Sequence, residues 1–325
     1  MDIVLTCPVC HHNTDEGGRL YRVREMMFGT REVFPYVECA GCGCLWLADI
    51  PRDMARHYPP DYYAFAPRRL SYDSTLASFL KRTRTRWYLG EKNIIGFFAG
   101  KVFGAPFWSG WLAGRSMSRD ADILDVGSGT GDMLLAFRRE GFTHLTGVDP
   151  FIEKDIAYEN GVKVFRSELA SLPGQFDFIM MHHAFEHVAN PLETLKAIRS
   201  HLRLGGIALI RIPVVSQAWK TYGVNWVQLD APRHIFLHTE DSMNILAHDA
   251  GMVVKKVVYD SSAFQFWGSE QYQRDIPLMD ERSYGKNPAA SIFSRSQIDA
   301  WSRAARELNE RKAGDQACFF LERRQ

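Results

Sequence analysis

Four cysteines near the start of the chain have the type and spacing of metal ligands. Cys7 and Cys10 form one Cys-x-x-Cys pair, and Cys39 and Cys42 form another. Two such pairs can present four thiolates to one ion, which completes a tetrahedral zinc site with no open position. The pattern therefore predicts a structural zinc ribbon. Cys44 is a further thiol that could replace Cys42 as a ligand.

Three glycines at alternate positions form the second chemical feature. Gly127, Gly129 and Gly131 lie between an apolar run, 123–126, and a helical pattern, 133–139. Glycines here let a ligand approach the backbone at a helix N-terminus. Asp149 ends the next apolar run, at the spacing from which a carboxylate reaches a pair of ribose hydroxyls. A dinucleotide fingerprint would need a third glycine where Asp132 stands, so that interpretation is disfavoured.

Histidines are the third feature. His182 and His183 end an apolar run, His187 follows, and His234 lies in a later segment. The carboxyl end of a strand is where open α/β sheets bind ligands, and a histidine with a pKa near 7 can take a proton from an acceptor. We favour His183 as the general base, with His187 and His234 as alternatives. His187 and His234 could equally be held by local structural contacts.

The order acid-x-Gly-x-Gly-x-Gly, with Glu186-His187-Val188 further on, resembles the class I S-adenosylmethionine-dependent methyltransferases that act on small molecules. This resemblance implies a set of residues that bind S-adenosylmethionine: Asp125, Gly127, Ser128, Gly129, Gly131, Asp149, Glu168 and His182. It also implies that segment 213–240 contributes to the acceptor pocket. There Trp226 would provide an apolar wall and Arg233 a handle for a carboxylate or phosphate.

Elements that could position these residues alternate regularly from Asp122 onward. Apolar runs at 123–126, 144–148, 162–165, 176–181, 207–212, 252–259 and 318–322 predict strands, with helical patterns between several of them. The predicted fold class is α/β, a doubly wound, mostly parallel, seven-stranded Rossmann-like sheet with an N-terminal zinc ribbon and a helical cap. The predicted domains are a ribbon at 1–50, a linker and cap at 51–115, and a methyltransferase domain at 116–325 with insertions at 213–240 and 260–315.

Segment 68–119 departs from the average composition, with ten basic residues against two acidic ones and an apolar centre, 94–114. Pro106 and several glycines argue against one membrane-spanning helix. One interpretation is a helical cap with a solvated basic face. The other is a surface that meets an anionic membrane or a lipid-linked substrate.

The remaining composition is ordinary: 325 residues with a formal net charge of +1, which gives no general attraction to nucleic acid. The cysteine spacing and the lack of a signal-peptide pattern predict a cytoplasmic protein, with an alternative location at the inner face of the membrane. The predicted function is methyl transfer from S-adenosylmethionine to a small molecule or glycan, such as a nucleotide- or lipid-linked sugar, at a hydroxyl with a histidine general base. A carbon acceptor beside a ketone would use the same base and stays open. The alternatives are a methyltransferase of nucleic acid or protein and a non-catalytic binding module.

Overall fold

The computed structural model describes residues 6–13, 17–58, 70, 72–112 and 117–324. The chain forms two compact units. Unit 1 comprises Met1–Pro59, His183–Leu195 and Ile210–Leu321, and unit 2 comprises Pro60–His182, Lys196–Leu209 and Glu322–Gln325. Part of the predicted linker, 59–67, and the basic residues Arg68, Arg69 and Arg115 lie outside the described residues.

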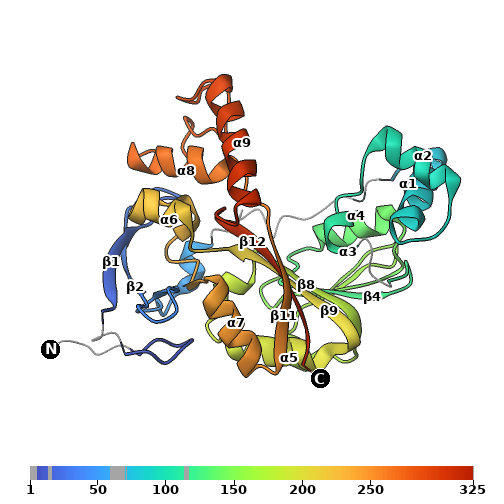
Figure 1. Ribbon diagram of the computed structural model, residues 1–325, viewed down its shortest axis with the longest axis horizontal. Coiled ribbons are helices and arrows are strands. Elements are labelled where there is room, and N and C mark those ends of the chain that lie inside the picture. Colours follow the sequence, from blue (N-terminus) through green and yellow to red (C-terminus); the bar gives the residue numbers. More distant parts are fainter. Residues whose placement is uncertain (1–5, 14–16, 59–69, 71, 113–116, 325) are drawn as a thin grey trace. The chain divides into compact units, whose positions relative to one another are not determined.

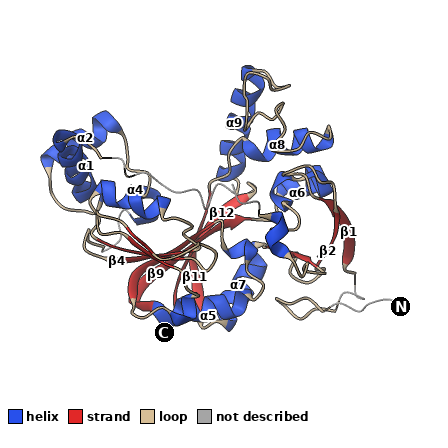
Figure 2. Ribbon diagram, turned by 180° about the vertical axis from the view of Figure 1, so that it is seen from behind, coloured by secondary structure: helices blue, strands red, loops and turns tan. Residues whose placement is uncertain are grey.

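Unit 2 is built on a mostly parallel sheet, coloured red in Figure 2. Its strands are β4 (Asp122–Val126), β5 (His144–Val148), β6 (Ile156–Ala157), β7 (Lys163–Phe165), β8 (Phe176–His182) and β9 (Leu202–Pro213), whose last residues belong to unit 1. The order is β9-β8-β4-β5-β7-β6. β4 runs parallel to β5 and β8, β5 runs parallel to β7, and β6 is antiparallel to β7. The carboxyl ends of β4 and β5 therefore meet at one edge.

The helices of unit 2 include three where a cap was predicted: α1 (Thr75–Tyr88), α2 (Ile94–Phe103) and the short α3 (Ser109–Leu112). α1 and α2 lie side by side in Figures 1 and 2. Gly96 permits this packing, because a Cβ on it would lie 2.1 Å from the Thr83 carbonyl oxygen. α4 (Asp132–Glu140) follows the glycine loop, and its Glu140 forms a buried ion pair of 2.9 Å with Arg84 of α1. α5 (Pro191–His201) begins in unit 1 and ends in unit 2.

Unit 1 contains an antiparallel sheet of four strands in the order β1-β2-β3-β10. These are β1 (Arg19–Arg24), β2 (Val33–Glu38), β3 (Leu45–Leu47) and β10 (Phe236–Leu237). Neither β3 nor β10 was predicted: β10 comes from segment 213–240, and its Phe236 pairs with Trp46 of β3. The Thr239 hydroxyl donates to the Cys42 carbonyl at 2.6 Å. The cysteine-rich ribbon and the predicted acceptor segment are thus one folded structure.

The rest of unit 1 surrounds β11 (Met252–Tyr259) and β12 (Gln316–Arg323), which continue the order β11-β12-β9. Its helices are α6 (Gln217–Tyr222), α7 (Glu240–Asp249), α8 (Phe264–Gln273) and α9 (Arg295–Glu310). Its 3₁₀ turns are η2 (Met54–His57), η5 (Phe185–His187), η6 (Gly223–Asn225) and η7 (Val227–Leu229). Unit 2 contains the 3₁₀ turn η4 (Leu169–Ser171). Figure 1 shows α8 beside α9. The predicted α/β fold class is confirmed, with eight strands in place of seven because of the short edge strand β6.

Candidate functional site

The glycine loop in unit 2 has a backbone that other residues adopt only with strain. Gly127, Gly129 and Gly131 have φ angles of 73°, 52° and 91°. A Cβ added to Gly131 would lie 2.9 Å from Cγ2 of Val164. The loop therefore keeps its backbone free of side chains where it leads from β4 into α4, as close approach of a ligand requires.

Asp149 is fixed beside this loop. Its side chain is buried, and its two oxygens accept hydrogen bonds of 2.8 Å from the backbone N–H groups of Gly129 and Phe151. Each carboxylate oxygen can accept more than one hydrogen bond, so acceptor capacity is left for a pair of hydroxyls. This geometry fits the ribose of an adenosyl cofactor.

The acids of this site favour a cationic ligand. Burial, and then the charge of Asp149, raise the pKa of Asp125 well above its usual value. Burial also raises the pKa of Asp149, against the two N–H groups that bind it. Asp132 places a further carboxylate in the first turn of α4. A ligand with an ammonium or sulfonium group relieves this repulsion, whereas the pyrophosphate of a dinucleotide increases it.

The other predicted cofactor residues also lie in unit 2. The Ser128 hydroxyl donates to the Gly129 carbonyl at 3.4 Å. Glu168 is exposed immediately before η4. His182 ends β8, and its ring lies against Trp111 with centroids 4.6 Å apart. Their individual roles toward the cofactor stay predictions.

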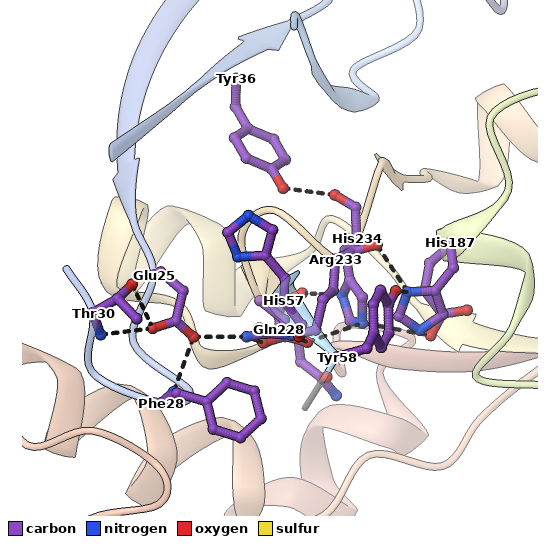
Figure 3. Close-up of polar contacts among 12 residues, drawn as sticks. Glu25, Phe28, Thr30, Tyr36, His57, Tyr58, His187, Gln228, Arg233 and His234 are labelled. Carbon is purple, nitrogen blue, oxygen red and sulfur yellow. Dashed lines mark hydrogen bonds and ion pairs between the residues drawn. The ribbon is translucent and has the colours of Figure 1, made fainter. Parts of the chain in front are cut away.

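Two of the predicted catalytic histidines meet in unit 1. The rings of His187 and His234 have centroids 4.8 Å apart, and Figure 3 shows them side by side. Glu186, which precedes His187 in η5, is fully buried. One ligand atom from each of these three residues lies within 4.8 Å of the other two. We call them the Glu–His–His cluster. Glu186 was not among the predicted site residues, although the Glu-His-Val motif contains it.

Backbone carbonyls fix the protonation of both imidazoles (Figure 3). Nδ1 of His187 lies 2.8 Å from the Arg233 carbonyl oxygen, and Nδ1 of His234 lies 2.7 Å from that of Gln228. A carbonyl oxygen only accepts, so each Nδ1 carries the hydrogen. Nε2 of each neutral ring then has a lone pair that can bind a proton or a cation.

His183 is placed differently from the other two histidines. Its Nε2 accepts a 2.8 Å hydrogen bond from Arg211, whose guanidinium is itself held by Asp260 at 2.6 Å. Its Nδ1 lies 3.4 Å from Oε1 of Glu186. Because an arginine only donates, neither ring nitrogen of His183 keeps a free lone pair. The geometry therefore supports His187 as proton acceptor more than His183, the residue favoured from the sequence.

Neighbouring charges keep Glu186 ionised, and burial keeps His234 neutral. Burial alone would raise the pKa of Glu186, but His183, followed by the charges of His187 and His234, lowers it to about 2. Burial, and then His187, lower the pKa of His234 to about 4, against the opposing charges of Asp230 and Glu186. Near neutral pH the cluster thus combines an ionised carboxylate with a neutral His234.

The two predicted substrate residues are both fully buried. The Trp226 indole N–H donates to Asp315 at 2.9 Å. Arg233 donates to Glu25 at 3.0 Å and to Asp230 at 2.5 Å, so the predicted handle for a carboxylate or phosphate is already paired within the protein. In this structure Arg233 instead stabilises the loop that carries His234.

The cysteines gather as the spacing predicted. The sulfur atoms of Cys7, Cys10, Cys39 and Cys42 lie within 4.8 Å of one another and could hold a metal ion. Cys10 and Cys39 are 3.4 Å apart, and Cys7 and Cys42 are 3.8 Å apart. Sulfurs bound to one tetrahedral zinc lie about 3.8 Å apart. Cys44 stays an alternative ligand, because its sulfur is 3.4 Å from that of Cys42 and 3.7 Å from that of Cys7.

Unit 1 also contains a cavity of about 700 Å³. Tyr21 and Trp219 pack edge to face on its lining, and both donate to the Glu38 carboxylate, at 2.7 and 3.2 Å. Lys220 and Lys312 add positive charge. These residues were not predicted as a site, since they lie far apart in the chain and match no motif.

Comparison with known proteins gives the class of this domain. A family model described as a methyltransferase domain matches residues 107–257. The ubiquinone biosynthesis O-methyltransferase of Pseudomonas paraeruginosa is 25% identical over 174 residues, which cover 47% of this chain and 73% of that protein. Its namesake from Aeromonas salmonicida is 31% identical over 99 residues, 27% of this chain and 41% of that protein. EEF1A lysine methyltransferase 2 of Danio rerio is 44% identical over 39 residues, 12% of this chain and 17% of that protein.

The chain thus spans less than half the length of two of these three relatives. A solved complex of the Haloferax volcanii Trm112 methyltransferase activator with a methyltransferase is similar in fold, with a TM-score of 0.44 and 19% identity. The alignment covers 65% of this chain and 86% of that one. Residues 107–257, which include the glycine loop and its acids, form an S-adenosylmethionine-dependent methyltransferase domain.

Proposed function

We propose that this enzyme transfers the methyl group of S-adenosylmethionine to a hydroxyl of a small molecule. The observation that carries the acceptor assignment is the Glu–His–His cluster, whose free imidazole nitrogens and carboxylate can take up the proton that a hydroxyl loses. Two relatives of the chain are O-methyltransferases by name, which supports the same acceptor class.

S-adenosylmethionine supplies an electrophilic methyl group on a sulfonium. We assign its ribose to Asp149 and its methionine portion to the glycine loop, with Asp125 facing the positive charge. The chemistry asked of the protein is modest, because in-line displacement depends mainly on alignment and exclusion of water. His187 is the residue that we assign to the acceptor proton, since its Nδ1 is committed to the Arg233 carbonyl and its Nε2 makes no hydrogen bond within the described part of the chain.

Several sequence-based predictions are left out of this proposal. No observation supports a glycan acceptor, and the protein-methylating relative matches over only 39 residues.

We propose zinc as the ion of the four-cysteine cluster, with a structural role, because four thiolates leave no open position. A thiolate site and six free cysteines fit a reducing compartment such as the cytoplasm.

We further propose that α1 and α2 contact a lipid surface or a lipid-linked acceptor. No helix in the described residues is long and apolar enough to cross a membrane. However, large apolar side chains on these two helices are 49–72% exposed: Leu76, Phe79, Ile94, Phe98, Val102 and Phe103. Exposed lysines, Lys92 and Lys101, accompany them. An apolar face with basic residues is typical of a helix that lies in the membrane interface.

The structure changes which basic residues support this contact. Lys81 pairs with Asp73 at 2.7 Å, Arg84 is buried against Glu140, and Arg86 pairs with Glu91. Much of the positive charge predicted to be a solvated face is therefore neutralised within unit 2, and the apolar side chains are the stronger argument.

A turnover assay tests the acceptor chemistry. The enzyme is incubated with S-adenosylmethionine and a panel of phenols, catechols and alcohols, and methylated products are identified by mass. His187→Gln should lower turnover by roughly 10²–10⁴-fold with cofactor affinity nearly unchanged. His248→Gln is the matched control, because that side chain is 68% exposed. Products methylated only on nitrogen, or full turnover in His187→Gln, would contradict the proposal.

Vesicle co-sedimentation tests the lipid contact. Wild type should sediment with vesicles of phosphatidylglycerol and phosphatidylcholine, and Phe98→Ser/Val102→Ser should lose most of this binding. Leu204→Ser, an exposed apolar change on β9, serves as the control. Equal binding by the apolar double variant and wild type would remove α2 from the proposal.

A further inference from the structure

We propose that the Glu–His–His cluster binds a divalent transition-metal ion, distinct from the ion of the four cysteines. The first argument is the direction of its hydrogen bonds. With both Nδ1 hydrogens committed to carbonyl oxygens, His187 and His234 present only lone pairs toward the cluster. The third member, a carboxylate, also only accepts. Three acceptors within 4.8 Å of one another form a site that one cation can satisfy.

The burial of Glu186 is the second argument for a bound cation. Glu186 is fully buried, and neither of its oxygens has a hydrogen bond among the described residues. Nδ1 of His183 lies 3.4 Å and Nε2 of His234 lies 3.9 Å from Oε1 of Glu186, and neither contact has the geometry of a hydrogen bond. The guanidinium of Arg233 is committed to Glu25 and Asp230. A buried carboxylate without a hydrogen-bonded partner is costly, and a bound cation removes that cost.

The third argument is that groups around both imidazoles already hold them in the orientation that metal-binding histidines require. Such a histidine donates its second N–H to a carbonyl or carboxylate, which fixes its tautomer and ring orientation. Arg233 and Gln228 supply these carbonyls. The Tyr58 hydroxyl lies 3.3 Å from Nδ1 of His187 (Figure 3). A carboxylate oxygen of Asp230 lies 3.8 Å from Nε2 of His234. Both rings are therefore oriented before any ion binds.

The donor set indicates the class of ion. Two imidazoles and one carboxylate suit Zn²⁺, Fe²⁺ or Co²⁺, whereas four thiolates select zinc. Ligands of one ion lie about 3.3 Å apart, so binding would draw the three atoms together from separations of up to 4.8 Å. His187 is only partly buried, which leaves room for an exchangeable ligand. Nε2 of His187 cannot hold the ion and take a proton at the same time, so with the ion bound the acceptor hydroxyl would be activated at the ion instead. That role rests on the proposed function, but binding of the ion does not.

Metal content tests the site without any turnover. Wild type and variants are equilibrated by dialysis against the same Zn²⁺ concentration, and protein-bound zinc is measured by elemental analysis. Wild type should hold one equivalent more than Glu186→Gln, and also one more than His187→Gln. Glu186→Gln is nearly isosteric and removes a buried charge, and His187→Gln alters a partly exposed side chain. Circular dichroism establishes that each is folded. His248→Gln should match wild type.

Two outcomes decide the proposal. Loss of one zinc equivalent in folded Glu186→Gln and His187→Gln, with none lost in His248→Gln, supports it. Equal zinc in wild type and in either folded cluster variant overturns it. Neither result depends on the methyl acceptor. If the enzyme methylates hydroxyls but binds no extra ion, the metal site is refuted and the proposed function stands.

Discussion

Removal of the Arg233 guanidinium should destabilise unit 1 more than removal of any exposed charge. Arg233 is fully buried and forms ion pairs with Asp230 at 2.5 Å and Glu25 at 3.0 Å. Breaking a buried pair from one side costs about 3–5 kcal/mol, because the other charge stays buried. Glu25 keeps hydrogen bonds from Phe28 and Thr30, so most of the penalty should come from Asp230. We therefore expect Arg233→Met to lose about 3 kcal/mol of unfolding free energy.

Urea unfolding followed by tryptophan fluorescence measures this loss. Arg274→Met is the matched control, because Arg274 pairs with Glu270 at the surface and is 50% exposed; it should cost less than about 1 kcal/mol. Adding Asp230→Asn to Arg233→Met should recover part of the stability, since the uncompensated carboxylate is gone. A cost of Arg233→Met no larger than that of Arg274→Met would refute the argument that this network holds the loop of His234.

Two further predictions concern a carboxylate and the cysteines. Arg139, and then Lys81, lower the pKa of Asp73 to about 2 against the effect of burial, so its contribution to stability is present above a pH of about 4 and is lost as pH falls toward 2. Asp73→Asn should lower the free energy of unfolding by about 1 kcal/mol at neutral pH, a small loss because solvent surrounds Arg139. The urea midpoints of the variant and the wild type should converge as pH falls from about 5, and a constant difference between them would contradict this prediction. A strong chelator should lower the melting temperature of wild type but not of a folded Cys39→Ser variant, because the metal supplies folding free energy; calorimetric scans with and without chelator decide this, and no effect on wild type would rule out a structural metal.

The sequence predicted the elements of the sheet well. The predicted strands at 144–148 and 252–259 coincide with β5 and β11, because each is an apolar run of strand length. The glycine loop and Asp149 were predictable for a similar reason, since strand, loop and helix follow one another along the chain. Local patterns sufficed where the residues that make a site are close in sequence.

Contacts between residues far apart in the sequence could not be predicted. Nothing near Phe236 indicates that it pairs with Trp46, so the dependence of segment 213–240 on the ribbon could not be predicted. The same holds for Arg233, whose partner Glu25 lies 208 residues earlier. Its burial turns a predicted substrate handle into an internal ion pair. The choice between His183 and His187 depends on which ring nitrogen faces Arg211 or the Arg233 carbonyl, and no sequence pattern specifies that.

Cofactor binding tests the central assignment most directly. Titration calorimetry should show one S-adenosylmethionine, or its demethylated product, bound per chain. Asp149→Ala should weaken this binding by about 1.5–3 kcal/mol, roughly 10- to 150-fold, through loss of a charge-assisted hydrogen bond to the ribose. Asp299→Ala, an exposed change on α9, should leave binding unchanged. Tight binding of NAD with none of S-adenosylmethionine, or equal affinity in Asp149→Ala and wild type, would contradict the account.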